Sequence, residues 1–209
     1  MLLLLRVFAL GRRSEQFFHV LSKWWRRTGS VSMIAGPDLL TAVVEPYEFL
    51  DFVSGKLSRQ FVQGEADLQQ RLALLDKRAD PDSLYRVNEF FCHADTWQMT
   101  MRQLARESNA VLMDLRSFSP ENQGCLYELE QLLDIVDLAQ VTFLVDETTD
   151  LRFLEKTLQM LWNNVNIDSP NCRVESPTVQ IVHAGGQSRQ LMKTLMFRLS
   201  DSLSMESVS

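Results

Sequence analysis

The chain has 209 residues, of which 45% are hydrophobic and 23% charged, a composition typical of a globular protein that buries a core. Its 27 acidic and 21 basic residues give a formal net charge of −6, which argues against broad nucleic-acid binding, because neutralising many phosphates needs surplus cations. The spacing of Cys92, Cys125 and Cys172 matches neither a structural zinc site nor a disulfide framework, so we expect a reducing compartment and no metal.

Apolar runs of strand length alternate with segments of helical period along the first half of the chain. Gly and Pro residues lie between these predicted strands and helices, where they indicate turns and loops. In chain order, the predicted elements are a strand at residues 3–10, a helix at 14–27, a strand at 30–35, a helical stretch at 46–57 and 65–75, a strand at 84–92 and a helix at 97–108.

The second half continues the alternation. Its predicted elements are a strand at 110–115, a helix from Pro120, a strand at 141–145, a helix at 151–161, a strand at 178–183 and a helix at 188–203. Residues 110–115 are almost continuously apolar, as in a strand buried on both faces of a parallel sheet. Ser119 before Pro120 predicts a helix N-cap followed by proline at the first helical position.

This alternation predicts the fold class. Strands separated by helices favour a three-layer, doubly wound α/β fold around a mostly parallel sheet of about five to six strands, because right-handed crossovers place helices on both faces. We expect one domain over residues 1–200 and a polar tail over residues 201–209.

The apolar run at residues 2–5 has two interpretations. It is too short for a membrane span, which needs roughly 20 apolar residues, and it lacks the basic region and cleavage site of a signal peptide. One interpretation is a buried first strand. The other is the end of a preceding membrane helix, with this chain as the soluble part of a longer, membrane-attached protein.

Polar residues follow most of the predicted strands. In an open parallel sheet, ligands bind outside the carboxyl ends of the strands near the topological switch point, so these residues are expected at one edge. The candidate ligand-binding residues are Gly11, Arg12, Arg13, Gly36, Asp38, Asp114, Arg116, Ser117, Gly124, Asp146, Gly185, Gly186 and Ser188.

Two of these groups suggest a phosphate site. Gly185 and Gly186 precede a predicted helix, where backbone amides approach a phosphate, and Arg12 and Arg13 would add charge-assisted contacts. The alternative is an ordinary tight turn with solvated arginines. Neither a dinucleotide fingerprint nor a Walker A motif is present, so we predict no resident cofactor.

The segment from Asn122 to Glu130 carries the most specific pattern. If the helix begins at Pro120, then Glu121, Gly124 and Glu128 share one side, and Gly124 lets a ligand approach the backbone beside the Glu128 carboxylate. Such a carboxylate can hold ribose hydroxyls or assist cleavage of a glycosidic bond. The alternative is that Glu128 and Glu130 both face solvent.

Residues 111–134 resemble parts of two families. Cys125, Glu128 and Leu129 resemble the helix of TIR (Toll/interleukin-receptor) domains that carries a cysteine, then glutamate and leucine. Gly124 and Glu128 are similar to the Gly-x-x-x-Glu helix of nucleoside deoxyribosyltransferases. In both families this glutamate engages the ribose of a nucleotide or nucleoside. The resemblance therefore implies a TIR-like, flavodoxin-like fold and assigns that role to Glu128 alone.

A broader similarity runs through most of the chain. Residues 6–15, 34–38, 48–52 and 110–116 are similar to the cytosolic domain of uncharacterised bacterial multi-pass membrane proteins. This resemblance implies a cytoplasmic α/β domain behind membrane helices, at the inner face of the membrane. It supplies no reaction.

Two functions follow as expectations. The first is a TIR-like signalling or interaction module that binds a protein partner, a second copy or a nucleotide-type ligand. The second is an enzyme that hydrolyses or transfers a nucleoside or NAD glycosidic bond through Glu128. The sequence lacks the serine-aromatic loop of TIR domains and a second convincing catalytic group, which favours the first. An enzyme would need a closed, partly dry site and a shifted pKa at Glu128.

Overall fold

The computed structural model describes residues 1–6, 11–35, 60–174, 177–185 and 188–205, with the backbone alone for 11–15, 188 and 202–205. Its elements are β1 (Leu2–Arg6), α1 (Gly11–Trp25), β2 (Val31–Ala35), β3 (Phe61–Val62), α4 (Glu65–Ala73), β4 (Val87–Cys92), α5 (Trp97–Glu107), β5 (Ala110–Asp114), α6 (Gln123–Ile135), the 3-10 helix η3 (Leu138–Gln140), β6 (Val141–Val145), α7 (Leu151–Trp162), β7 (Gln180–His183) and α8 (Ser188–Met205). The helix predicted at 46–57 lies outside the described residues.

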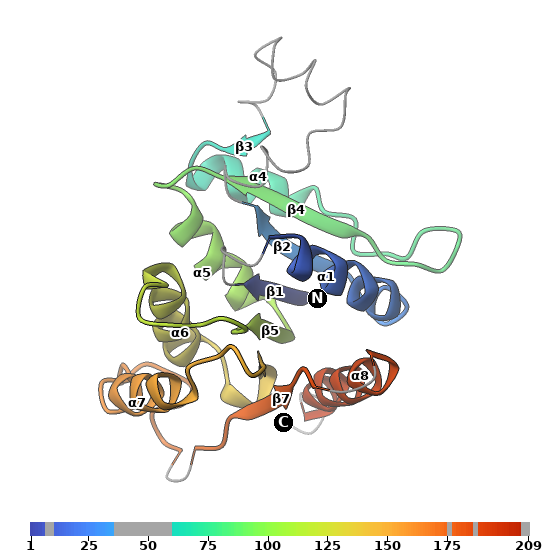
Figure 1. Ribbon diagram of the computed structural model, residues 1–209. Helices are drawn as coiled ribbons and strands as arrows, with labels where there is room; N and C mark the ends of the chain where they lie inside the picture. The colour runs from blue at the N-terminus through green and yellow to red at the C-terminus, as the bar shows by residue number, and fades with distance from the viewer. Residues whose placement is uncertain (7–10, 36–59, 175–176, 186–187, 206–209) are drawn as a thin grey trace.

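The strands form one open, parallel sheet in the order β3-β4-β2-β1-β5-β6-β7 (Figure 1). In chain order, β2 lies beside β1, β3 lies at the edge of the sheet, β4 lies between β3 and β2, and β5 lies on the other side of β1. The strand order therefore reverses between β1 and β5, which makes this the topological switch point. The predicted doubly wound α/β fold of the flavodoxin-like type is confirmed.

The sheet has seven strands, one more than the upper number predicted. The additional strand is β3, which has only two residues and pairs with the end of β4 through Phe61 and Phe91. Two residues are too few to show an alternating pattern, so the sequence carries no periodic signal for this strand.

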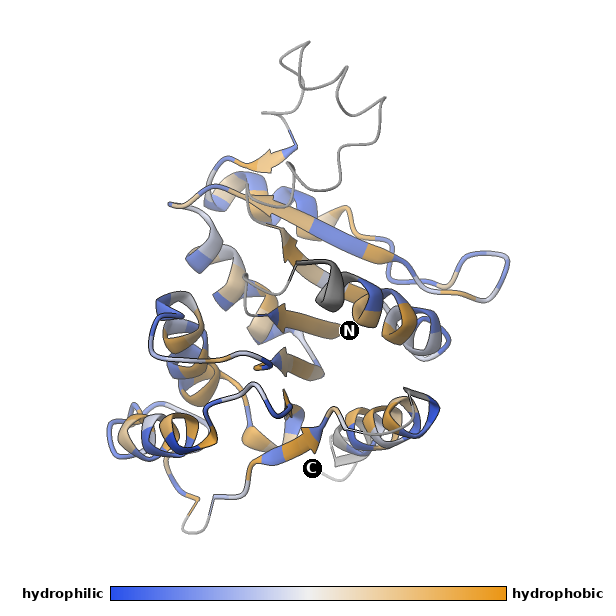
Figure 2. Ribbon diagram, viewed as in Figure 1, coloured by the Kyte–Doolittle hydropathy of each residue, from blue (hydrophilic) through white to orange (hydrophobic). Residues whose placement is uncertain are grey.

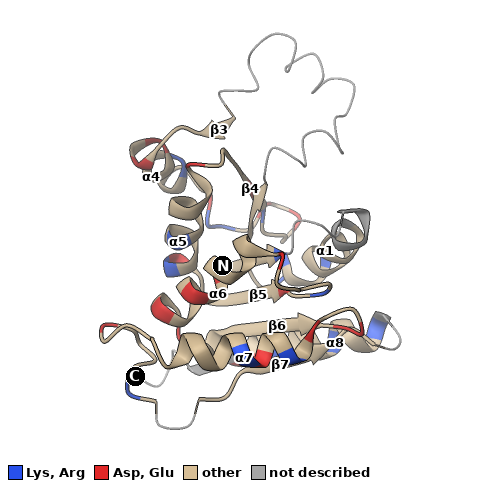
Figure 3. Ribbon diagram, turned by 60° about the vertical axis from the view of Figure 1, so that its left-hand side comes forward, with Lys and Arg blue, Asp and Glu red and all other residues tan. Residues whose placement is uncertain are grey.

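Helices cover both faces of the sheet. α4, α5, α6 and α7 lie on one face, and α1 and α8 lie on the other (Figure 1). Apolar residues predominate in the strands between the two helical layers, although β4 and β7 also have hydrophilic stretches (Figure 2), whereas most Lys, Arg, Asp and Glu residues lie on helices and connecting segments (Figure 3). Within the described ranges, no helix is both long and apolar enough to cross a bilayer.

The central strands are buried on both sides. Leu3 and Leu5 of β1 pack into the core under α5 and α6, and Leu2 and Leu4 pack into the core under α1 and α8. Residues 2–5 are thus a central strand rather than the end of a helix. β5 has the same arrangement and is wholly buried between β1 and β6, as predicted.

The start of α6 differs from the prediction. The helix begins at Gln123, after Asn122, and not at Pro120. The backbone N–H and the hydroxyl of Ser119 both donate to Oδ1 of Asn122, at 2.8 and 3.1 Å, so the segment forms a turn before the helix. Glu121 lies in this turn and does not share a helical side with Gly124 and Glu128.

The C-terminal end of the chain also differs from the prediction. α8 continues to Met205, so the first part of the predicted polar tail at 201–209 is helical, and residues 206–209 lie outside the described residues.

The connection from α6 to β6 depends on one buried asparagine, Asn171, which is 1% exposed. Its Nδ2 donates to the carbonyls of Leu133 and Val136, each at 2.8 Å, and its Oδ1 accepts from the N–H of Leu138 at 3.1 Å. We expect Asn171→Ala to lower the free energy of unfolding by about 3 kcal/mol, because the Val136 carbonyl and the Leu138 N–H lose a buried partner, whereas the Leu133 carbonyl keeps the Ser169 hydroxyl at 2.8 Å. Chemical denaturation measures this. Asn164→Ala, at an exposed asparagine, is the control, and an equal effect of both substitutions would contradict the assignment.

Candidate functional site

A buried ion pair lies at the carboxyl end of β5, beside the switch point. Asp114 is fully buried and Arg116 is 4% exposed. The Arg116 side chain donates from Nε to Oδ1 of Asp114 at 2.8 Å and from Nη2 to Oδ2 at 2.6 Å, which is a bidentate pair. The guanidinium also lies 4.7 Å from the ring centroid of Phe17 in α1. Arg116 is therefore fixed inside the protein, and its charge is neutralised there.

The loops after β5 and β6 are tied together beside this pair. Ser117 has a φ of 61°, which turns its backbone toward the second loop. Its N–H donates to Oγ1 of Thr148 at 2.9 Å, and the two hydroxyl oxygens lie 3.0 Å apart. The hydroxyl of Thr148 in turn donates to Oδ1 of Asp146, which also accepts the Thr148 N–H at 2.9 Å. The fold thus brings the predicted residues Ser117 and Asp146 together through Thr148.

Thr148 was not predicted as a site residue. The available signal was the sequence Asp146-Glu147-Thr148, since an aspartate often accepts the N–H two residues later in a tight turn. Among the residues that the structure describes, no group of three or more His, Cys, Asp or Glu is arranged to hold a metal ion.

Glu128 lies on the inner side of α6 and is 2% exposed, although it is charged in water. Its Oε2 is buried and has no hydrogen-bond partner among the described residues. Burial raises the pKa of Glu128 to about 8, so the carboxyl group is largely protonated at neutral pH. The interpretation that the helix acids face solvent is thus wrong for Glu128, whereas Glu130 is exposed.

Cys125 lies one helical turn before Glu128 and is also buried. Burial raises the pKa of its thiol above the usual range, and the negative charges of Glu128 and Asp114 raise it further. Cys125 is therefore an unreactive thiol at neutral pH.

Two aromatic side chains flank the same turn of α6. A Cβ added at Gly124 would lie 4.0 Å from Cη2 of Trp97, the first residue of α5. The rings of Trp97 and Tyr127 meet edge to face with their centroids 5.3 Å apart. Both side chains are half-buried. The contact between Trp97 and α6 carries no signal in either segment of the sequence alone.

The remaining predicted residues are only partly described. Gly36, Asp38 and Gly186 lie outside the described residues. Gly11, Arg12 and Arg13 form the first turn of α1, and Ser188 begins α8, with only the backbone described for each.

Gly185 follows β7, and two strands separate β7 from β1. The strand ends next to Gly185 and Arg12 are therefore roughly 14 Å apart across the sheet. Because α1 and α8 share one face, their first turns lie at the same edge. The phosphate hypothesis stays a prediction.

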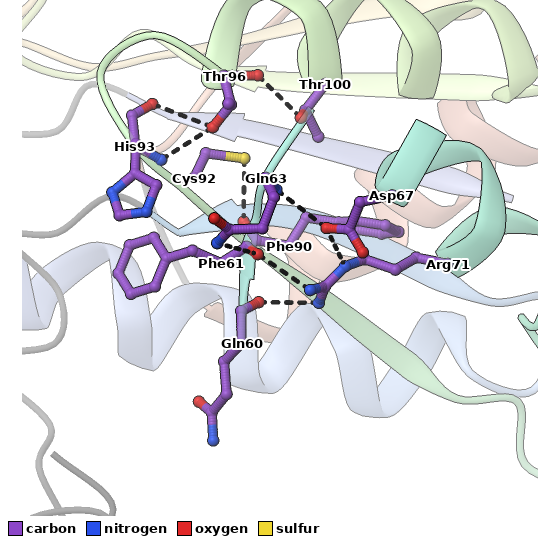
Figure 4. A network of polar contacts seen from close by, with 10 residues as sticks. All are labelled: Gln60, Phe61, Gln63, Asp67, Arg71, Phe90, Cys92, His93, Thr96 and Thr100. Carbon is purple, nitrogen blue, oxygen red and sulfur yellow. Dashed lines mark hydrogen bonds and ion pairs between the residues drawn. The ribbon is translucent and has the colours of Figure 1, made fainter. Parts of the chain in front are cut away.

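A second polar network lies at the carboxyl ends of β3 and β4 (Figure 4). Arg71 of α4 donates to the carbonyls of Gln60 and Phe61, at 2.8 and 3.0 Å, and to the carboxylate of Asp67 at 2.9 Å. These bonds fasten the two-residue strand β3 to α4. The network has a structural role at the edge of the sheet.

His93 and Cys92 belong to the same network. The N–H of His93 donates to Oγ1 of Thr96 at 3.0 Å, and its ring stacks on Phe61 with the centroids 4.3 Å apart. Cys92 is buried and its thiol donates to the carbonyl of Phe90 at 3.6 Å, while burial raises its pKa. Neither side chain is placed to act as a nucleophile or base with the other.

Comparisons with protein-family models, with curated proteins and with solved structures gave no match to this chain. The functional argument therefore depends on the geometry at the carboxyl ends of β1 and β5.

Proposed function

We propose that this chain binds a nucleoside-type or nucleotide-type ligand at the carboxyl ends of β1 and β5, with the Glu128 carboxyl group as its polar anchor. One observation carries the proposal: a carboxyl group that is 2% exposed and has an unpartnered oxygen lies in α6, the helix that follows β5, and β5 is one of the two strands at the switch point of the doubly wound sheet. Burying a polar group without a partner is unfavourable, so such a group in a native protein suggests a functional role. Hydroxyl groups of a ligand would complete its hydrogen bonds.

In this proposal the chain is a TIR-like signalling or interaction module, whose ligand-bound form a protein partner or a second copy recognises. The loops after β5 and β6 support this role, because hydrogen bonds join them to each other at the carboxyl edge of the sheet. The cytoplasmic location and the attachment to a membrane stay predictions from the resemblance.

A second candidate is cleavage of a glycosidic bond. The raised pKa of Glu128 favours it, because a carboxylic acid that is protonated near neutral pH can donate a proton to a leaving group. Glycosidases usually use a second carboxylate as nucleophile or base. The two neighbouring carboxylates, Asp114 and Asp146, are already hydrogen-bonded to Arg116 and Thr148. This arrangement favours binding over catalysis.

The experiment is a calorimetric titration of the parent protein, Glu128→Leu and Glu130→Leu with ADP-ribose, NAD, adenosine and nucleoside monophosphates. We expect at least one ligand to bind the parent, and Glu128→Leu to weaken it about tenfold or more, because a buried hydrogen bond is lost. Glu130→Leu is the matched control, since this exposed glutamate lies two residues away, and its affinity should equal that of the parent. Binding of none of these compounds at millimolar concentration would overturn the proposal.

Chromatography of the same mixtures tests the second candidate. Release of nicotinamide or of a free base by the parent, lost in Glu128→Gln, would identify an enzyme. Unchanged NAD and nucleosides after prolonged incubation would leave ligand binding as the function.

A further inference from the structure

The surroundings of Glu128 allow the chemistry of the ligand to be narrowed, on the basis of the proposed function. Glu128 is almost completely covered, so a ligand can reach its carboxyl group only where a neighbouring side chain yields. Gly124 lies one turn before Glu128 on the same side of α6 and presents no side chain. The covering group next to Gly124 is the indole of Trp97.

Trp97 has the features of a residue that can move. It is the first residue of α5, at the carboxyl end of the sheet, and its side chain is half-buried. No hydrogen bond of its indole N–H is found in the described part of the chain. Its recorded ring contact is with Tyr127, a residue of the same helix as Glu128. Trp97 is thus held by apolar and aromatic packing, which a second flat ring can replace.

We propose that Trp97 covers the approach to Glu128 and stacks on a planar aromatic base of the ligand, while Glu128 binds a hydroxyl group of the same molecule. Tyr127 forms the adjoining wall, because its ring meets the indole edge to face. Gly124 has no side chain that would block this approach once the indole has moved. The ligand class is therefore a nucleoside with an exposed base, rather than a sugar phosphate.

The discriminating experiment compares adenosine with ribose 5-phosphate as probes, on the parent, Trp97→Leu, Glu128→Leu and Trp24→Leu. Leucine keeps an apolar side chain but removes the flat ring, and we expect Trp97→Leu to weaken adenosine binding about tenfold, the effect of losing one base-stacking contact. Ribose 5-phosphate has no base, so it should bind the parent at least tenfold more weakly than adenosine does, and Trp97→Leu should not change its affinity further. Trp24 is a partly exposed tryptophan of α1 on the other face of the sheet, so Trp24→Leu is the matched control.

Intrinsic fluorescence gives a second readout that does not depend on the stability of a variant. Adenosine should quench the emission of the parent and of Trp24→Leu, and the quenching should be absent in Trp97→Phe. Adenosine binding that needs Glu128 but is unaffected by Trp97→Leu, with no quenching of Trp97, would overturn this inference and leave the proposed function standing. Failure of adenosine and of all related ligands to bind the parent would overturn both.

Two substitutions at Gly124 test whether the ligand approaches Glu128 beside this residue of α6. Gly124→Ala should keep the affinity for adenosine, because a Cβ fits at 4.0 Å from Trp97. Gly124→Leu should lower the affinity by at least tenfold with a folded protein, judged by its cooperative thermal melt. Equal affinities of the two variants would contradict an approach beside Gly124.

Discussion

The free energy of unfolding is expected to fall by several kcal/mol between pH 5 and pH 8, and Glu128→Gln is expected to remove most of this fall. The ordinary pKa of a glutamate is 4.5, and burial raises that of Glu128 to about 8. Above pH 4.5 the unfolded chain loses this proton while the folded protein keeps it, so stability decreases until both states are ionised above pH 8. Over the three pH units from 5 to 8, the free energy of unfolding therefore falls by roughly 4 kcal/mol, at about 1.4 kcal/mol per pH unit.

Urea denaturation at intervals from pH 5 to pH 8 measures this effect. Glutamine has the shape of the protonated acid, so Glu128→Gln should unfold with a nearly constant free energy over the same range and should be more stable than the parent at pH 8. Glu130→Gln, at the exposed glutamate of the same helix, should retain the dependence of the parent. A parent whose stability is flat across this range would contradict the burial of an unpartnered carboxyl group.

Two other carboxyl groups with a shifted pKa, those of Asp67 and Asp80, affect stability only below the range from pH 5 to pH 8. A backbone hydrogen bond from Gln63 lowers the pKa of Asp67, and a side-chain hydrogen bond from Arg86 lowers that of Asp80. Their stabilisation is present above the ordinary pKa of 3.8 and is lost as the pH falls below it. The change between pH 5 and pH 8 therefore reports on Glu128.

Arg116→Leu is expected to lower the free energy of unfolding by roughly 3–5 kcal/mol, because it leaves Asp114 charged and buried without its bidentate partner. Loss of the contact with Phe17 adds to the effect. The double variant Asp114→Asn/Arg116→Leu removes the buried charge as well and should recover part of the loss. Chemical denaturation of the parent, Arg116→Leu and the double variant at one pH measures both the loss of stability and its partial recovery. A loss below about 1 kcal/mol for Arg116→Leu would place the pair in solvent, where ion pairs contribute little.

The sequence predicted the central part of the fold because its signal is local. The runs at residues 2–5 and 110–114 are apolar at every or nearly every position, and strands with that pattern are buried on both faces of a parallel sheet. Strand β3 was missed because two residues have no period. The start of α6 was predicted at Pro120, but the hydrogen bonds from Ser119 to Asn122 stabilise a turn there, in competition with the helix.

The site was predicted less completely, for a physical reason. Glu128 and Glu130 are equivalent as residue types, and only the rotation of α6 against the sheet decides that one is buried and the other exposed. Arg116 was predicted to bind a ligand, whereas its charge is satisfied by Asp114 two residues earlier. Trp97 meets Gly124 through the packing of two helices, so its role depends on tertiary structure.

The most direct test of the account is the carboxyl NMR signal of Glu128, followed while adenosine or ADP-ribose is added to the labelled protein and assigned by its loss in Glu128→Gln. If Glu128 binds the ligand, this signal should shift with saturable dependence on ligand concentration and its apparent pKa should move away from about 8, because the ligand hydroxyl becomes the missing partner of Oε2. A Glu128 signal that keeps its position and its pKa while either ligand saturates the protein would contradict the account.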